Sequence, residues 1–156
     1  MSPFAWILGL ILPSVGAEGA QGLPVPPPME HAAIVRPRTP NTALAAPEGF
    51  TPAPDVVVAP IAAPPKRVYD ALRAVAAEQP RVYLAAEYAD RLQVHYVART
   101  PTMNWPDLIM AEVSGPPEGP SSIVLWSRSI YGYGDRGLNK VRVEAWLASL
   151  PAALAK

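Results

Sequence analysis

Two stretches of this chain carry apolar residues at the spacing of an amphipathic helix. The first begins at Pro64-Pro65, ends before Pro80 and repeats its apolar positions at i, i+3, i+4, i+7 and i+8. These positions are Val68, Ala71, Leu72, Val75 and Ala76. The second stretch covers about residues 138–150, with Val143, Trp146, Leu147 and Leu150 as its inward positions. Each predicted helix therefore has one apolar face to bury.

Shorter segments alternate apolar with other residues, or run apolar between prolines, and predict strands. One precedes the first helix and four follow it, over about residues 56–58, 82–88, 92–97, 108–113 and 122–127. Turn residues at 89–91 and 115–120 join the later strands into hairpins. The order β-α-β-β-β-β-α predicts a single small α+β domain. It is expected to contain a mainly antiparallel sheet of four to five strands, with two helices packed on one face.

The N-terminal segment, residues 4–17, is apolar apart from Ser14. As a helix it would span about 21 Å, which is short of the roughly 30 Å hydrocarbon core of a bilayer. Small residues near Ala17 fit a signal peptide cleaved after that residue, although the first residues contain no Lys or Arg. The segment predicts an exported, periplasmic protein of the cell envelope. If residues 1–17 are not cleaved, they act instead as a short hydrophobic anchor and associate the protein with the membrane, facing the periplasm.

Prolines divide the remainder of the chain. Most of the 21 prolines lie before Lys66, and proline fixes φ and removes a backbone donor. Residues 18–46 are therefore predicted to be a proline-rich linker, and residues 47–151 the folded domain.

The amino-acid composition argues against several classes of function. The chain has no cysteine, so disulfides, thiolate nucleophiles and zinc–thiolate sites are excluded, and with only two histidines we expect no metal site and no cofactor. Thirteen basic and thirteen acidic residues give a net charge of zero. A nucleic-acid partner is not expected, because binding to phosphates needs a clear basic surface.

The polar groups that could carry a function concentrate between the last strand and the last helix, over residues 126–144. Glycines there lead into a helix N-terminus, a position that favours anions. With a neighbouring acid, the candidate ligand-binding residues are Asp107, Arg128, Tyr131, Tyr133, Asp135, Asn139, Lys140 and Arg142. An anionic small molecule or a lipid head group would suit them.

A structural interpretation of the same residues stays open. Asp135, or the region of Gly137, would cap the last helix, and Arg142 would pair with a carboxylate. Asp107 would face Arg128 across the hairpin if the two strands are in register. These contacts need no ligand.

Two sequence motifs in this region resemble a known family. Ser127-Arg128-Ser129 is followed over residues 132–144 by Gly-Tyr-Gly-Asp-Arg-Gly-Leu-Asn-Lys-Val-Arg-Val-Glu, and Trp105-Pro106-Asp107 forms a second motif. Over about residues 36–150 the chain resembles the uncharacterised family called domain of unknown function 1499. The resemblance implies that one polar cluster contains Asp107, Arg128, Asp135, Asn139 and Arg142. It implies no activity.

The sequence departs from that family at two positions. Thr42 stands where the family often has cysteine, and Leu108 stands where it often has a second acid. A mechanism that requires that cysteine or that pair of acids is therefore not expected here.

Three hypotheses follow. The first is a non-enzymatic envelope protein that binds an anionic or polar ligand at residues 128–142. The second is a hydrolase-like enzyme that uses Asp107 and Asp135, with Arg128 stabilising negative charge. The third is a structural or assembly module that binds no small molecule.

Overall fold

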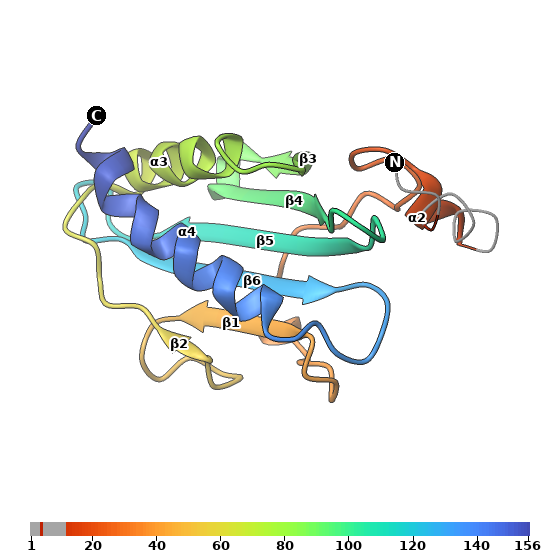
Figure 1. Cartoon of the computed structure of the whole chain (residues 1–156). Helices are drawn as coiled ribbons and strands as arrows, with labels where there is room; N and C mark the ends of the chain where they lie inside the picture. Colours follow the sequence, from red (N-terminus) through yellow and green to blue (C-terminus); the bar gives the residue numbers. More distant parts are fainter. Residues whose placement is uncertain (1–3, 5–11) are drawn as a thin grey trace.

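A six-stranded sheet with two long helices on it forms the body of the protein (Figure 1). The computed structural model describes Phe4 and residues 12–156. The strands are β1 (Thr42–Ala46), β2 (Val56–Val57), β3 (Val82–Tyr88), β4 (Gln93–Arg99), β5 (Pro106–Ser114) and β6 (Ser122–Ser129). The helices are α2 (Pro13–Gly16), α3 (Pro65–Ala77) and α4 (Leu138–Leu154), with short 3-10 helices η1 (His31–Ala33) and η2 (Ala89–Arg91).

The strands lie in the order β2-β1-β6-β5-β4-β3. All neighbouring pairs are antiparallel except β1 and β2, which are parallel. The predicted α+β class is therefore confirmed, as are the two helices packed on the sheet. The sheet has six strands rather than four to five, because a strand before the predicted first one was not anticipated.

That additional strand, β1, lies between β2 and β6, away from the sheet edges. Residues 43–46 are fully buried, with Ala43 and Ala45 facing the helices and Leu44 and Ala46 facing the other side. A strand covered on both faces has no polar alternation, and alanine has a low strand propensity. The prediction of irregular linker was therefore wrong for residues 42–46.

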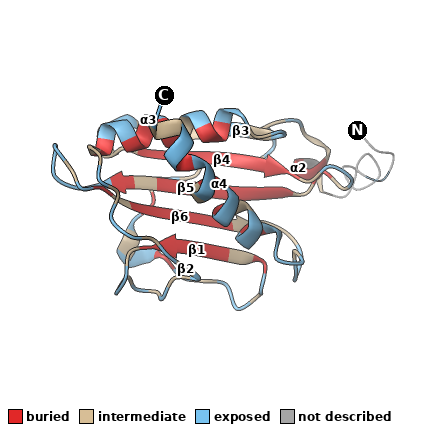
Figure 2. Ribbon diagram, turned by 60° about the vertical axis from the view of Figure 1, so that its left-hand side comes forward, coloured by how far each residue is buried: buried red, intermediate tan, exposed pale blue. Residues whose placement is uncertain are grey.

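Helices α3 and α4 cover one face of the sheet, here called the helix face (Figure 2). The predicted apolar stripe of α3 is buried there, and the sides of both helices that point away from the sheet are exposed. Trp146 of α4 packs edge-on against Tyr96 of β4, with ring centres 5.8 Å apart. Burial of these large side chains adds to the apolar contact between the layers.

The other face of the sheet, here called the opposite face, is covered by the chain that precedes β1. Met29 and Ile34 pack there against apolar residues of β1, β5 and β6. Gln93 of β4 binds both backbone groups of Met29: it accepts the N–H at 2.5 Å and donates to the carbonyl at 3.0 Å. In Figure 1 this part of the chain runs behind the sheet on its way to β1.

Two buried side chains hold the segment around α2. Arg99, 3% exposed, donates to the carbonyls of Ser14, of Gly19 at 2.8 Å and of Gln21 at 3.0 Å. Asn104 donates to the carbonyls of Val15 and Ala17. All five acceptors are backbone oxygens.

The hydrophobic segment predicted over residues 4–17 lies largely outside the described residues, which omit 1–3 and 5–11. Among the residues that are described, we find no helix with the length and apolar character needed to cross a membrane.

Candidate functional site

The N-terminus of α4 is capped by Asp135. One carboxylate oxygen accepts the Gly137 N–H at 2.9 Å, and the other accepts the Asn139 N–H at 2.8 Å. Gly137 has a φ of +78°, a left-handed conformation that glycine adopts without strain. These bonds satisfy two of the backbone donors that a helix leaves unpaired, so the predicted capping role of Asp135 is confirmed.

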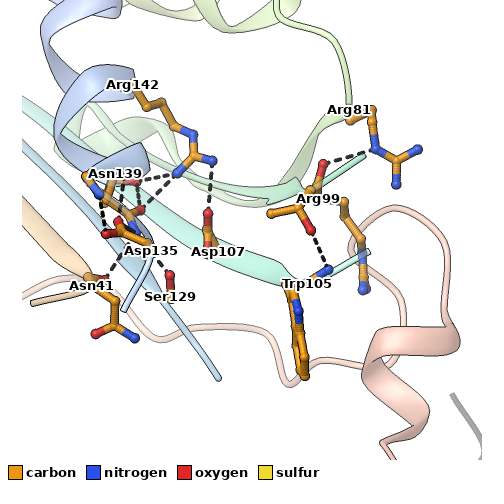
Figure 3. A network of polar contacts seen from close by, with 12 residues as sticks. Asn41, Arg81, Arg99, Trp105, Asp107, Ser129, Asp135, Asn139 and Arg142 are labelled. Carbon is orange, nitrogen blue, oxygen red and sulfur yellow. Dashed lines mark hydrogen bonds and ion pairs between the residues drawn. The ribbon is translucent and has the colours of Figure 1, made fainter. Parts of the chain in front are cut away.

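Asn139, in the first turn of α4, is fully buried and connects the helix to the sheet (Figure 3). Its amide nitrogen donates to Asp135 at 2.6 Å, to Ser129 Oγ at 3.0 Å and to the Asn41 carbonyl at 3.1 Å. Its amide oxygen accepts from Ser127 Oγ at 2.6 Å. One side chain thereby joins α4, β6 and the residue before β1.

Arg142 lies one turn further along α4 and pairs with Asp107 of β5 at 2.9 Å (Figure 3). The Asp107 side chain is 2% exposed and that of Arg142 is 13% exposed, so the pair is largely shielded from water. Arg142 also donates to Ser127 Oγ at 3.0 Å and to Asn139 at 2.9 Å. The predicted pairing of Arg142 with a carboxylate is confirmed. We call Asp107, Asp135, Asn139 and Arg142, with Ser127 and Ser129, the polar network.

Arg128 does not belong to the polar network. In the β5–β6 register, Asp107 lies opposite Ser129, whereas Arg128 lies opposite Leu108. Successive side chains of a strand point to opposite faces, so Arg128 projects from the face opposite to Asp107. The expected contact between Asp107 and Arg128 is therefore wrong, and so is the place of Arg128 in a single polar cluster.

On the opposite face, the guanidinium of Arg128 lies over the ring of Trp126, 5.3 Å from its centre. Its Nε is buried without a hydrogen-bond partner, and no carboxylate of the described residues forms an ion pair with it. Burial lowers the pKa of Arg128, because the charged form loses hydration. The side chain borders a cavity of about 290 Å³ between the sheet and residues 20–27.

The remaining candidate residues are spread over the surface near the start of α4. Tyr131 hydrogen-bonds through its hydroxyl to Ser14 and lies against Trp105, with ring centres 5.8 Å apart. Tyr133 is 73% exposed, and Lys140 forms a long, exposed ion pair with Glu144 at 4.0 Å. A second hollow, of about 440 Å³, lies beside the two rings and the edge of the polar network.

Several buried polar residues of the opposite face were not predicted. His95 of β4 is fully buried, its Nε2 lies 3.0 Å from Gln93 Oε1, and burial lowers its pKa to about 4. Gln93 also donates to Glu112 at 2.5 Å, and Glu112 contacts His31 at 3.1 Å. The available signal was the presence of Gln93 and His95 at alternate positions of a strand that is apolar from there to Ala98 and ends in Arg99. Within the described part of the chain, no three acidic or histidine side chains converge as a metal site.

A sequence model of the family described as "Protein of unknown function (DUF1499)" matches residues 35–150. The chain belongs to the DUF1499 family. The resemblance found in the sequence is thereby confirmed, and the DUF1499 match covers the sheet, helix α3, helix α4 as far as Leu150 and the whole polar network. Comparison with curated proteins returned no match.

In this DUF1499 protein, Asp107→Asn should lower the free energy of unfolding by about 3 to 5 kcal/mol, because it leaves Arg142 without its buried counter-charge. Glu144→Gln is the matched control, since it also converts a carboxylate to an amide but in an exposed pair. It should change stability by less than about 0.5 kcal/mol. Urea denaturation measures both variants, and equal midpoints would contradict a stabilising role for the polar network.

His95 should make stability depend on pH. The unfolded chain takes up a proton near pH 6.5 and the folded chain only near pH 4, so stability falls as pH decreases through this window. The loss should be about 3 kcal/mol, and His95→Gln should remove it. Urea midpoints measured between pH 7.5 and 4 test this, with His31→Gln as the control for the partly exposed histidine. An unchanged pH dependence in His95→Gln would refute the assignment.

Proposed function

We propose that this protein is an exported, non-enzymatic binding module that holds an anionic ligand at Arg128. The observation that carries the proposal is a partly buried guanidinium with no carboxylate partner among the described residues. Burying a charge is costly unless an opposite charge or hydrogen-bond acceptors compensate. An anion from solution would supply both.

The contacts of the polar network support a structural role for its members rather than a role in binding. Asp135 is engaged by the backbone and side chain at the start of α4, and Asp107 is engaged by Arg142. Asn139 donates and accepts within the network. These groups hold α4 against the sheet, so the site proposed here lies on the opposite face.

The same geometry argues against the hydrolase hypothesis. That mechanism needs Arg128 to stabilise charge beside Asp107, and the two side chains project from different faces of the sheet. A general acid or base must also lie within hydrogen-bond reach of the group it serves. One carboxylate oxygen of Asp107 already accepts a hydrogen bond from Arg142 at 2.9 Å, and this contact engages the group that would have to serve as the acid or base.

Export is the second part of the proposal and rests on the apolar pattern of residues 4–17. Intact-mass measurement of the protein recovered from a bacterial periplasm should give the mass of residues 18–156, with Glu18 at the N-terminus. Cleavage there would leave Arg99 its bonds to Gly19 and Gln21 and would remove the bonds that Arg99 and Asn104 form to Ser14, Val15 and Ala17. Recovery of the uncleaved chain from the membrane fraction would instead indicate the anchored form. Recovery of the uncleaved chain from the cytosol would contradict export.

Binding at Arg128 is tested with the full-length protein and a panel of anions: phosphate, acetate, decanesulfonate and dodecanoate. At 100 times its Kd, a ligand should add about 2.7 kcal/mol to the free energy of unfolding, which raises the melting temperature. Arg128→Met should abolish that shift, because the cation is lost while an apolar stem of similar length remains. Arg136→Met, which removes an exposed arginine of the same segment, should retain it. A shift that persists in Arg128→Met, or no shift with any anion, would refute the proposal.

A further inference from the structure

The cavity beside Arg128 is apolar over most of its surface. From the sheet side it is lined by Ala85 of β3, Val97 of β4, Leu108 of β5 and Ile130 just after β6. Arg128 is the charged residue among its lining residues. A largely apolar cavity with one well-placed polar group is the usual composition of a small-molecule binding site.

The other wall of the cavity is a single layer of chain, residues 20–27, which we call the covering segment. It contains Leu23 and Val25 on either side of Pro24, and both residues help line the cavity, although Val25 is also 72% exposed to solvent. Prolines have no N–H, so this segment can lie over an apolar space with few unpaired backbone donors.

The covering segment is fixed at its two ends by side chains of the sheet. At its start, Arg99 donates to the carbonyl of Gln21 at 3.0 Å. Near its end, the Tyr88 hydroxyl donates to the carbonyl of Pro26 at 2.6 Å, and Gln93 holds Met29 beyond it. The cavity therefore lies below a strap that is attached on either side of it.

Neither a small polar anion nor a neutral hydrocarbon matches this arrangement. A small anion at Arg128 would leave the apolar walls without a partner, and a hydrocarbon would leave the buried Nε of the partly buried guanidinium unpaired. An amphiphile satisfies both, with its head group at Arg128 and its apolar chain between the sheet and the covering segment. A volume of about 290 Å³ lies at the lower end of the range of small-molecule binding sites, which suits one narrow chain rather than the two chains of a membrane phospholipid.

We propose that the cavity binds a single-chain amphiphile with an anionic head group, such as a medium-chain carboxylate. This inference rests on the proposed anion site at Arg128 and adds the apolar part of the ligand. Hydrogen bonds between a guanidinium and a carboxylate are among the stronger polar contacts in proteins. The apolar chain would bury surface that the cavity otherwise leaves without contact.

Trp126 provides a local reporter for the test. Its ring lies under Arg128, and its indole N–H donates to Thr42 Oγ1 at 2.8 Å, so binding at Arg128 should shift its indole resonance. Full-length protein labelled with nitrogen-15 is titrated with dodecanoate below its micelle concentration, and Trp126→Phe assigns the resonance. Acetate and dodecanol are titrated in parallel, since one lacks the chain and the other lacks the charge.

Three variants locate the two parts of the ligand. Arg128→Met removes the charge, Ala85→Leu fills the apolar end of the cavity, and Arg136→Met is the control for charge outside it. Dodecanoate should bind the wild type and Arg136→Met alike. Its Kd should rise at least tenfold in Arg128→Met and in Ala85→Leu, and acetate and dodecanol should bind the wild type at least tenfold more weakly.

The outcomes separate this inference from the proposal beneath it. If acetate binds as tightly as dodecanoate and Ala85→Leu has no effect, Arg128 binds anions but the amphiphile is wrong. If dodecanoate and dodecanol bind the wild type equally, and the Kd for dodecanoate is unchanged in Arg128→Met, then neither the anion site at Arg128 nor the amphiphile site is correct. If vesicles of phosphatidylglycerol capture the protein through Arg128 while dodecanoate does not bind, the partner is a bilayer surface and the single-chain ligand is refuted. If a variant does not fold, the wild-type titrations followed at Trp126 still decide the chemistry of the ligand: equal binding of dodecanoate and acetate would refute the amphiphile, and equal binding of dodecanoate and dodecanol would refute the need for an anionic head group.

Discussion

The alternation of side chains along β6 determines where the polar groups of this protein lie. Ser127 and Ser129 project toward the helices and Arg128, between them, projects to the other side. Since the antiparallel register sets Asp107 against Ser129, that carboxylate meets Arg142 of α4. A slip of one residue between β5 and β6 would exchange these surroundings, placing a carboxylate in the apolar cavity. One register therefore produces both a closed network on the helix face and an unpaired cation on the opposite face.

Whether an element of this fold could be predicted from the sequence depends on how its two faces are buried by the rest of the protein. Helix α3 and strands β3 and β4 were predicted because their apolar positions recur at a regular period, and strands β5 and β6 because they are apolar runs on either side of the turn residues 115–120. Strand β1 lacks that alternation, since it is covered on both faces and consists mainly of alanine. Its partner β6 also lies some eighty residues further along the chain, and local patterns carry no information about such a pairing.

For the polar residues too, contacts between residues close in sequence were predicted and contacts between distant residues were mostly missed. The cap formed by Asp135 involves residues up to four positions away, and a sequence motif is enough to predict it. The family resemblance correctly grouped Asp107, Asp135, Asn139 and Arg142, but it could not assign Arg128 to a face, because a motif does not specify strand register. Gln93 and Arg99 were missed for another reason: they bind backbone groups of a segment interpreted as linker, whose composition gave no sign of docking.

The contacts around Arg99 and Asn104 have a consequence for how this protein can change. Both side chains bind carbonyl oxygens, which every residue possesses, so the N-terminal segment is recognised by the path of its backbone. Exposed positions such as Glu18 and Gln21 are therefore free to vary while the segment keeps its place. Arg99 has no such freedom, since a planar guanidinium with several fixed donors has no equivalent among the other side chains. Asn104 is also constrained, because it is buried and its side-chain amide donates to two of these carbonyls. Divergence in this part of the protein should thus be uneven, rapid at the exposed positions of the bound segment and slow at the two residues beneath it.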